Sequence, residues 1–218
     1  MDTSRNTPAP EPTPTGTPAP AGTPAPAPTL TERRSPWVVF TRADDPWVTA
    51  AAAGLRGRGG RVFRLDGREM PDAASLFTVF ARALSFPGYF GRNWHALVDC
   101  LHDWHGHGAD SKDVAVLIDN ADALLDAEFT GPFVSSLCQA AWRANLQLDA
   151  DGIPHEDEPP FTLHFVFLLG HVPPAAFAPA VAQGMDVRVA LEDGRLTATL
   201  TGDDWPETAA VSAAWHHP

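Results

Sequence analysis

Two continuous apolar runs constrain the fold of this 218-residue chain more than any other feature. Residues 114–118 and 165–169 contain no polar side chain. Such runs are typical of strands that are covered on both faces, because a strand with one wet face alternates apolar and polar residues. Helical patterns occur between and around the runs. The sequence therefore predicts an α/β fold, with a small, mostly parallel sheet packed with helices.

The region before these runs predicts an added N-terminal β-α unit. Residues 37–40 form a short apolar run that indicates a strand. Asp45 and Pro46 are typical of a helix start, with Asp at the N-cap and Pro just inside the helix. Glycines at 57–60 end that helix, and residues 61–65 predict the next strand. A β-α-β order of this kind favours two parallel strands.

Three further helices and a hairpin complete the predicted fold. Apolar residues recur at helical spacing over residues 72–85, 93–104 and 130–145. A short helix is expected over 177–183, and residues 149–160 read as an exposed acidic loop. Asp193-Gly194 lies between two strand-like segments, 186–191 and 196–201, and this predicts a C-terminal β-hairpin.

Composition divides the chain into a tail and one domain. Residues 1–31 are nearly all Pro, Ala, Thr and Gly, which have little apolar surface to bury, so they predict a disordered tail. We assign residues 1–35 to this tail and 36–218 to one α/β domain. Because no signal core or membrane-spanning run follows the N-terminus, we expect a cytoplasmic protein in which Cys100 and Cys138 are reduced.

Charge is unevenly distributed along the chain. The formal net charge is −12, and residues 93–218 hold nineteen acidic residues against four basic ones. This balance disfavours direct binding to nucleic acid and favours a basic protein as partner. The sequence contains no feature that requires a second copy of the chain, and we expect a monomer.

One segment resembles a known family. Its elements are Pro87-Gly88-Tyr89-Phe90-Gly91-Arg92-Asn93-Trp94 and, two residues later, Ala96-Leu97-Val98-Asp99-Cys100-Leu101, preceded by the strand and turn at residues 62–67. This pattern resembles that of the barstar family, the intracellular inhibitors of barnase-type ribonucleases. The resemblance covers residues 61–170 and leaves 171–218 as a C-terminal extension.

The resemblance implies a function and a set of partner-binding residues. In the family, the aromatic turn and the helix after it cover the ribonuclease active site, and an Asp of that helix enters the phosphate-binding pocket. That Asp corresponds to Asp99 here. The chain is therefore expected to be an inhibitor without enzymatic activity, cofactor or metal. Its expected contact residues lie on the turn and the helix: Tyr89, Gly91, Asn93, His95, Val98, Asp99 and His102. Gly91 is expected to permit a positive φ or a close approach of the partner.

Three departures from the family pattern keep an alternative open. His95 stands where the family usually has a second Asp, and Val98 stands where barstar has an aromatic contact residue. A Glu of the later helix would fall near Gln139. The alternative is a protein-interaction module of the barstar fold that does not inhibit a ribonuclease.

Two other interpretations rest on clusters of polar residues. His95, Asp99 and His102 share a helix face, and His105 and His107 follow, which is a weak pattern for a metal site. Asp119 and Asp122 follow a predicted parallel strand, where α/β enzymes often place their sites. Because no nucleophile elbow or phosphate-binding loop accompanies them, turn formation and helix capping are the better interpretation.

Overall fold

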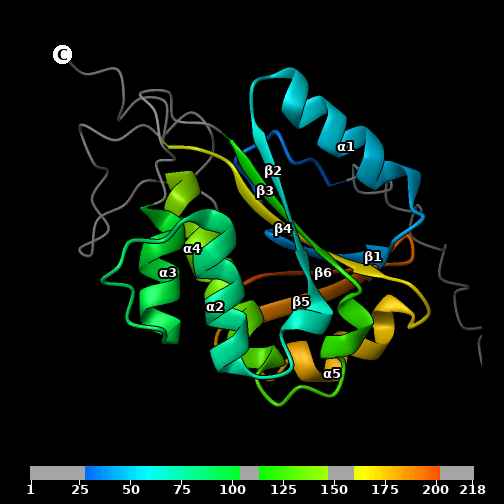
Figure 1. Cartoon of the computed structure of the whole chain (residues 1–218). Coiled ribbons are helices and arrows are strands. Elements are labelled where there is room, and N and C mark those ends of the chain that lie inside the picture. The colour runs from blue at the N-terminus through cyan, green and yellow to red at the C-terminus, as the bar shows by residue number, and fades with distance from the viewer. Residues whose placement is uncertain (1–27, 104–112, 147–159, 202–218) are drawn as a thin grey trace, which may run out of the picture.

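The computed structural model describes residues 28–103, 113–146 and 160–201. Within these ranges the chain forms six strands and five α-helices (Figure 1). The strands are β1 (Val38–Arg42), β2 (Arg61–Asp66), β3 (Val114–Asp119), β4 (Leu163–Leu169), β5 (Val187–Glu192) and β6 (Arg195–Leu200). The helices are α1 (Pro46–Gly57), α2 (Ala73–Leu84), α3 (Trp94–His102), α4 (Thr130–Leu146) and α5 (Ala178–Val181). Short 3-10 turns occupy Gly67–Glu69, Ala121–Leu124 and Pro174–Phe177.

All six strands belong to one sheet, in the order β2-β3-β4-β1-β6-β5. β2, β3, β4 and β1 pair in parallel, whereas β1–β6 and β6–β5 are antiparallel. The predicted α/β class with a mostly parallel sheet is confirmed, as are the N-terminal β-α unit and the C-terminal hairpin. β1 and β2 run in the same direction as predicted, but β3 and β4 lie between them.

Helices cover the two faces of the sheet unequally. α1 lies on one face, and α2 to α5 lie on the other (Figure 1). Ala115 and Leu117 of β3 pack in the α1 layer, while Val116 and Ile118 pack in the layer of the other helices. This double coverage explains the unbroken apolar run. Full burial of one such Val, Leu or Ile stabilises the fold by about 2 kcal/mol.

The segment before β1 packs on the same face as α1. Leu30 is buried in the α1 layer. The indole nitrogen of Trp47 donates a hydrogen bond to the carbonyl oxygen of Pro28 at 2.6 Å. The Thr162 hydroxyl donates to the carbonyl oxygen of Leu30 at 3.2 Å. We predicted a disordered tail over residues 1–35, but Leu30 of this stretch has a buried apolar site against the sheet, while residues 32–34 are exposed. The rest of the predicted tail, residues 1–27, lies outside the described residues, as does most of the predicted acidic loop.

Asp45 joins the start of α1 to β6. Its carboxylate accepts hydrogen bonds from the Trp47 amide at 2.9 Å and the Thr41 hydroxyl at 2.6 Å. Arg195 of β6 donates to both carboxylate oxygens, at 2.7 and 3.1 Å, and its guanidinium lies 5.2 Å from the Trp47 ring centre. Burial alone would raise the pKa of Asp45, but these hydrogen bonds outweigh burial and lower the pKa to about 2.

We predict that Arg195→Leu destabilises the protein strongly, because it leaves Asp45 without its counter-charge in a mostly buried position. The loss in free energy of unfolding should be about 3 kcal/mol, measured by urea unfolding. Arg42→Leu is the matched control, because Arg42 pairs with Asp44 on the open surface at 3.0 Å. The control should change stability by less than about 0.5 kcal/mol. Equal losses in the two variants would contradict this role for Asp45–Arg195.

His164 of β4 is the buried titratable group that holds the packed N-terminal segment. Its Nε2 lies 2.9 Å from the carbonyl oxygen of Glu32, and its Nδ1 lies 3.3 Å from that of Pro36. Burial lowers the pKa of His164 and outweighs these two oxygens, which act to raise it. The folded chain therefore keeps the imidazole neutral. A neutral imidazole has a single N–H, so it can donate to only one of the two carbonyl oxygens.

Stability should therefore decline when the pH falls below the ordinary histidine pKa of about 6.5. The unfolded chain then binds a proton that the folded chain excludes, so the free energy of unfolding decreases from about pH 6.5 toward the lowered pKa. When the pH falls from about 7.5 to about 5.5, we predict that the free energy of unfolding decreases by about 1 kcal/mol less in His164→Gln than in the unsubstituted chain. His95→Gln, which alters an exposed histidine outside the core, is the matched control. Urea midpoints at the two pH values provide the measurement, and an unchanged pH dependence in His164→Gln would refute the prediction.

Candidate protein-binding site

Residues 86–93 form a turn that projects a tyrosine from the surface. The Phe86 and Phe90 rings pack edge to face with centres 5.1 Å apart, and Phe90 also meets Phe77 of α2. The Phe90 amide donates to the carbonyl oxygen of Pro87 at 3.0 Å and closes the turn. Tyr89, between the two anchors, is 86% exposed. The phenylalanines thus hold the turn, and the tyrosine is free for contact with another molecule.

Asn93 connects this turn to α3. Its side-chain oxygen accepts from the Ala96 amide at 2.9 Å, and its amide nitrogen donates to the Gly91 carbonyl at 3.3 Å. The positive φ expected at Gly91 occurs instead at Arg92, where φ is 49°. A side chain at Gly91 would place its Cβ 3.0 Å from the Asn93 amide nitrogen. Gly91 therefore makes room for the Asn93 cap. The expectation that Gly91 itself has a positive φ is corrected.

α3 has one buried and one exposed face. Leu97 and Leu101 pack into the core, and so does Val98. Val98, which was expected to contact a partner, is only 4% exposed, and its side chain fills the core behind α3. His95 and Asp99 are one helical turn apart and both exposed. Together with Tyr89 on the turn before α3, they are the exposed residues of the candidate surface.

His102 is less accessible than its place on the predicted polar face suggested. Its side chain is only 12% exposed, and its Nδ1 lies 2.7 Å from a carboxylate oxygen of Asp103. His102 therefore lies at the margin of the surface formed by Tyr89, His95 and Asp99. Among the residues that the structure describes, no three His, Cys, Asp or Glu side chains group as metal ligands. His105 and His107 lie outside those residues.

Arg143 of α4 is a site residue that sequence reasoning missed. Its Nη1 lies 3.5 Å from a carboxylate oxygen of Asp99, whose side chain is 61% exposed. Gln139 precedes Arg143 by one helical turn, so the two share a face of α4. A lone cation in a largely apolar helix was the available signal, but only the packing of α3 against α4 brings it to Asp99.

Cys100 lies beside this surface but has no reactive character. The thiol is half-buried. Burial raises its pKa, and the charges of Asp103 and Asp99 add to the effect. A thiol that holds its proton is a poor nucleophile.

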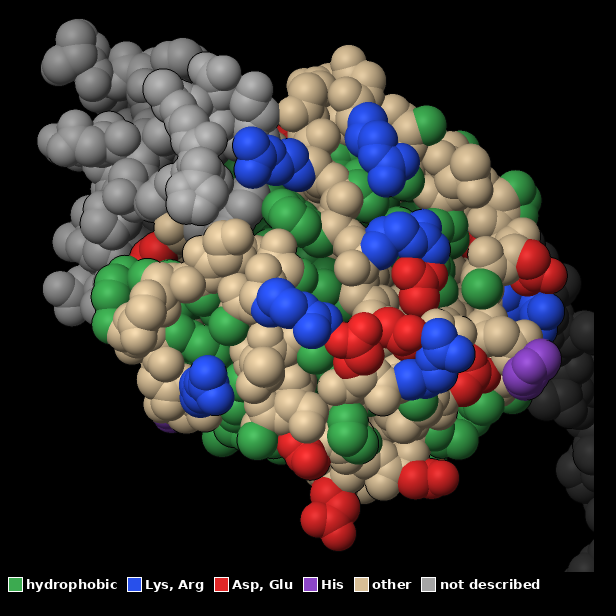
Figure 2. All heavy atoms as spheres, viewed as in Figure 1, with side chains coloured by type: hydrophobic (Ala, Val, Ile, Leu, Met, Phe, Trp, Pro, Cys, Tyr) green, Lys and Arg blue, Asp and Glu red, His purple; other side chains and the backbone are tan. Residues whose placement is uncertain are grey.

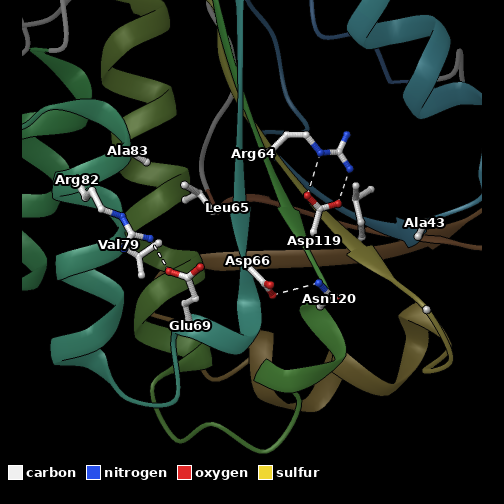
Figure 3. Close-up of a pocket in the computed structure, with 12 residues that line it drawn as sticks. Ala43, Arg64, Leu65, Asp66, Glu69, Val79, Arg82, Ala83, Asp119 and Asn120 are labelled. Carbon is white, nitrogen blue, oxygen red and sulfur yellow. Dashed lines mark hydrogen bonds and ion pairs between the residues drawn. The ribbon is translucent and has the colours of Figure 1, made fainter.

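Apart from this surface, the structure has a hollow of about 510 Å³ where β2 and β3 end (Figure 3). Its charged side chains point toward one another rather than into open space. Arg64 pairs with Asp119, and Arg82 of α2 pairs with Glu69. The Asn120 side chain donates to Asp66 at 3.0 Å. These groups form ion pairs and hydrogen bonds within the fold.

The Asp-Gly turn after β2 has a structural explanation. Asp66 accepts from the Arg68 side chain and amide and from Asn120, and these hydrogen bonds lower its pKa to about 2 against the opposing effect of burial. A Cβ at Gly67 would lie 2.9 Å from the backbone oxygen of Asn120. Only glycine permits this close approach of the turn after β2 to the turn after β3.

Asp122 also has a structural role. Its carboxylate accepts from the amides of Gly170, His171 and Val172 at 2.7, 2.9 and 2.7 Å. Burial alone would raise its pKa, but the three amides lower it to about 2. Of the two acids that suggested an enzyme, Asp122 thus holds the turn after β4, as the turn-forming interpretation predicted, whereas Asp119 pairs with Arg64 of the neighbouring strand.

The fold and this surface define an α/β protein with an exposed aromatic turn followed by a capped helix that presents an acid. Residues 60–154 match the model of the family described as Barstar (barnase inhibitor). This match includes the turn, α3 and the whole of α4, and it confirms the resemblance to the barstar family that the sequence predicted. A comparison with curated proteins gave no match. None of the helices in the described residues has the length and apolar character to cross a bilayer.

The cap of α3 should determine how well the site is formed. We predict that Asn93→Ala lowers the free energy of unfolding by about 1 kcal/mol, because the Ala96 amide loses its acceptor. Asn93→Asp should keep most of the stability, since a carboxylate accepts the same hydrogen bond. Chemical denaturation of both variants tests this, and equal destabilisation by Ala and Asp would show that the cap is not the cause.

Proposed function

We propose that this chain inhibits a ribonuclease by binding it directly and covering its active site. The proposed partner is a basic enzyme, and the proposed location is the cytoplasm. Inhibition of this kind requires no cofactor and no catalysis by the chain itself. The unit that carries it is a single domain over residues 36–218 together with the packed segment 28–35.

The observation that carries the proposal is the exposed carboxylate of Asp99 beside a surface that includes Tyr89. A ribonuclease site binds an oxyanion with charged donors, and a carboxylate on a rigid helix is a suitable substitute for that oxyanion. Tyr89 supplies a large amphipathic side chain of the kind that is enriched at protein interfaces. The match of this segment to the barnase-inhibitor family supports the same assignment.

Arg143 imposes a condition on the partner. The long, exposed pair with Asp99 contributes little energy, so a partner cation with better geometry displaces Arg143 at small cost. Arg143 then lies next to the bound enzyme and adds positive charge at the interface. On the face that Figure 2 shows, acidic and basic side chains are interspersed, so general acidity does not single out that face for a basic enzyme. Local pairing at Asp99 is therefore the proposed source of specificity.

The same contact supports a second function, a barstar-fold interaction module without ribonuclease inhibition. Arg143 partly neutralises Asp99, and His95 replaces a family acid with a group that can carry positive charge. Val98, buried in the core, adds no aromatic contact. Such a surface suits a partner that is less basic than a ribonuclease active site.

An affinity experiment with the folded full-length chain separates the two functions. The chain is immobilised, proteins are captured from cells that contain it, and each captured protein is purified and assayed for RNA cleavage with and without added chain. We predict that a captured ribonuclease is inhibited and that Asp99→Ala loses most of the binding, at least about a hundredfold, because a charge-assisted contact at the interface centre is removed.

Asp44→Ala is the matched control. Asp44 is an exposed acid that also pairs with an arginine, Arg42, but it follows β1 rather than lying on α3. The control should bind and inhibit like the unsubstituted chain. If Asp99→Ala recovers the same partner equally well, the inhibitor mechanism is wrong. A partner without ribonuclease activity would favour the interaction module.

A further inference from the structure

In the described part of the chain, the sheet ends on one side in the strand β5. It pairs with β6 over all six residues, from Val187–Leu200 to Glu192–Arg195. β5 contains no proline and no bulge, and Leu191 within it is 55% exposed. Natural edge strands usually carry features that prevent further pairing. Both edges carry exposed charges, but the two on β2, Arg61 and Arg64, have the same sign, whereas Arg188 and Glu192 on β5 have opposite signs.

The hairpin determines which backbone groups of β5 face outward. Asp193 and Gly194 form a two-residue turn in which both φ angles are positive, 49° and 75°. In such a turn the backbone groups of the flanking pair, Glu192 and Arg195, are hydrogen-bonded to each other. Along the two strands from there, hydrogen-bonded pairs alternate with pairs that are not hydrogen-bonded. The amide of Thr201 accordingly donates to the carbonyl of Asp186 at 2.7 Å. Even-numbered residues of β5 thus face β6, and the N–H and C=O groups of 187, 189 and 191 point away from the sheet. In the described part of the chain they have no backbone hydrogen-bond partner.

We propose that β5 pairs antiparallel with β5 of a second copy of this chain, around a two-fold axis at Ala190. In this register Val189 and Leu191 lie opposite Leu191 and Val189 of the other copy, and their outward backbone groups exchange hydrogen bonds. The exposed Leu191 side chain then packs against an apolar residue. The two sheets join into one continuous sheet across the axis.

Charge complementarity selects this register. Arg188, Ala190 and Glu192 lie on the other face of the strand, because side chains alternate. Pairing around Ala190 places Arg188 of each copy directly opposite Glu192 of the other, so two ion pairs flank a small side chain at the axis. Shifting the strands by two residues in either direction removes both ion pairs, because Arg188 or Glu192 then lies opposite Ala190. A shift of four residues in one direction places Arg188 opposite Arg188, where like charges repel. The sequence Arg-Val-Ala-Leu-Glu is thus complementary to itself.

This inference is independent of the proposed ribonuclease inhibition, because β5 lies outside residues 60–154, the family match. It replaces the monomer expected from the sequence. It also gives the C-terminal extension a role, since the hairpin supplies the edge through which two copies associate.

Sedimentation velocity of the full chain over a wide range of protein concentrations tests the proposal. We expect a reversible monomer–dimer equilibrium. Arg188→Glu places acid opposite acid, and Glu192→Arg places Arg opposite Arg, so each variant alone should dimerise about tenfold or more weakly. An equimolar mixture of the two variants should recover the dimer, because the acidic edge of one complements the basic edge of the other.

The mixture keeps the test independent of folding, since a misfolded variant would not recover association. Leu191→Pro is a second variant, which removes one outward N–H while the N–H groups that bond to β6 remain. It should also weaken the dimer. A chain that is monomeric at every concentration, a dimer unaffected by Arg188→Glu, or variants that fail to associate when mixed would each overturn the proposal.

Discussion

The fold depends on the burial of β3 and β4 on both faces. Their alternate side chains enter two separate apolar layers, so the sheet needs a cover on each side. α1 and residues 28–35 provide one cover, and α2 to α5 provide the other (Figure 1). α3, which carries the candidate site, rests on α4 through Leu97, Val98 and Leu101 in the second layer. The position of the site is therefore a consequence of how the sheet is covered.

Aspartates at the carboxyl ends of the parallel strands stabilise the connections. Asp45 after β1, Asp66 at the end of β2 and Asp122 after β3 each accept several hydrogen bonds, and each has a pKa near 2. In many α/β proteins this edge of the sheet holds the functional site. Here its carboxylates hold turns, helix starts and a strand end together, and the exposed polar groups of the aromatic turn and α3 remain for contact with a partner.

Local chemistry explains why most elements were predictable. The apolar runs, the Asp-Pro start of α1, Asn93 at the cap of α3 and the Asp-Gly hairpin turn each act through near neighbours in the chain, and the structure contains each of the corresponding elements. The exposure of Tyr89 and Asp99 also follows from spacing, since apolar neighbours turn inward and leave them outside. Two expectations differ from the structure. Leu30 is buried by segments that lie far away in the chain, and the positive φ expected at Gly91 lies at Arg92, next to the local cap of α3.

The sequence by itself determined the class of fold, the parallel strands, the aromatic turn and the helix that presents Asp99, because periodicity, capping and the barstar-like motif are encoded locally. Tertiary structure alone decided that β1 joins β4 rather than β2, that Arg195 neutralises Asp45, and that Arg143 lies beside Asp99. It also placed β5 at the edge of the sheet that the described residues form. These features depend on contacts between segments that lie far apart in the chain. Strand order and helix packing determine those contacts, and both are set only when the whole core is assembled.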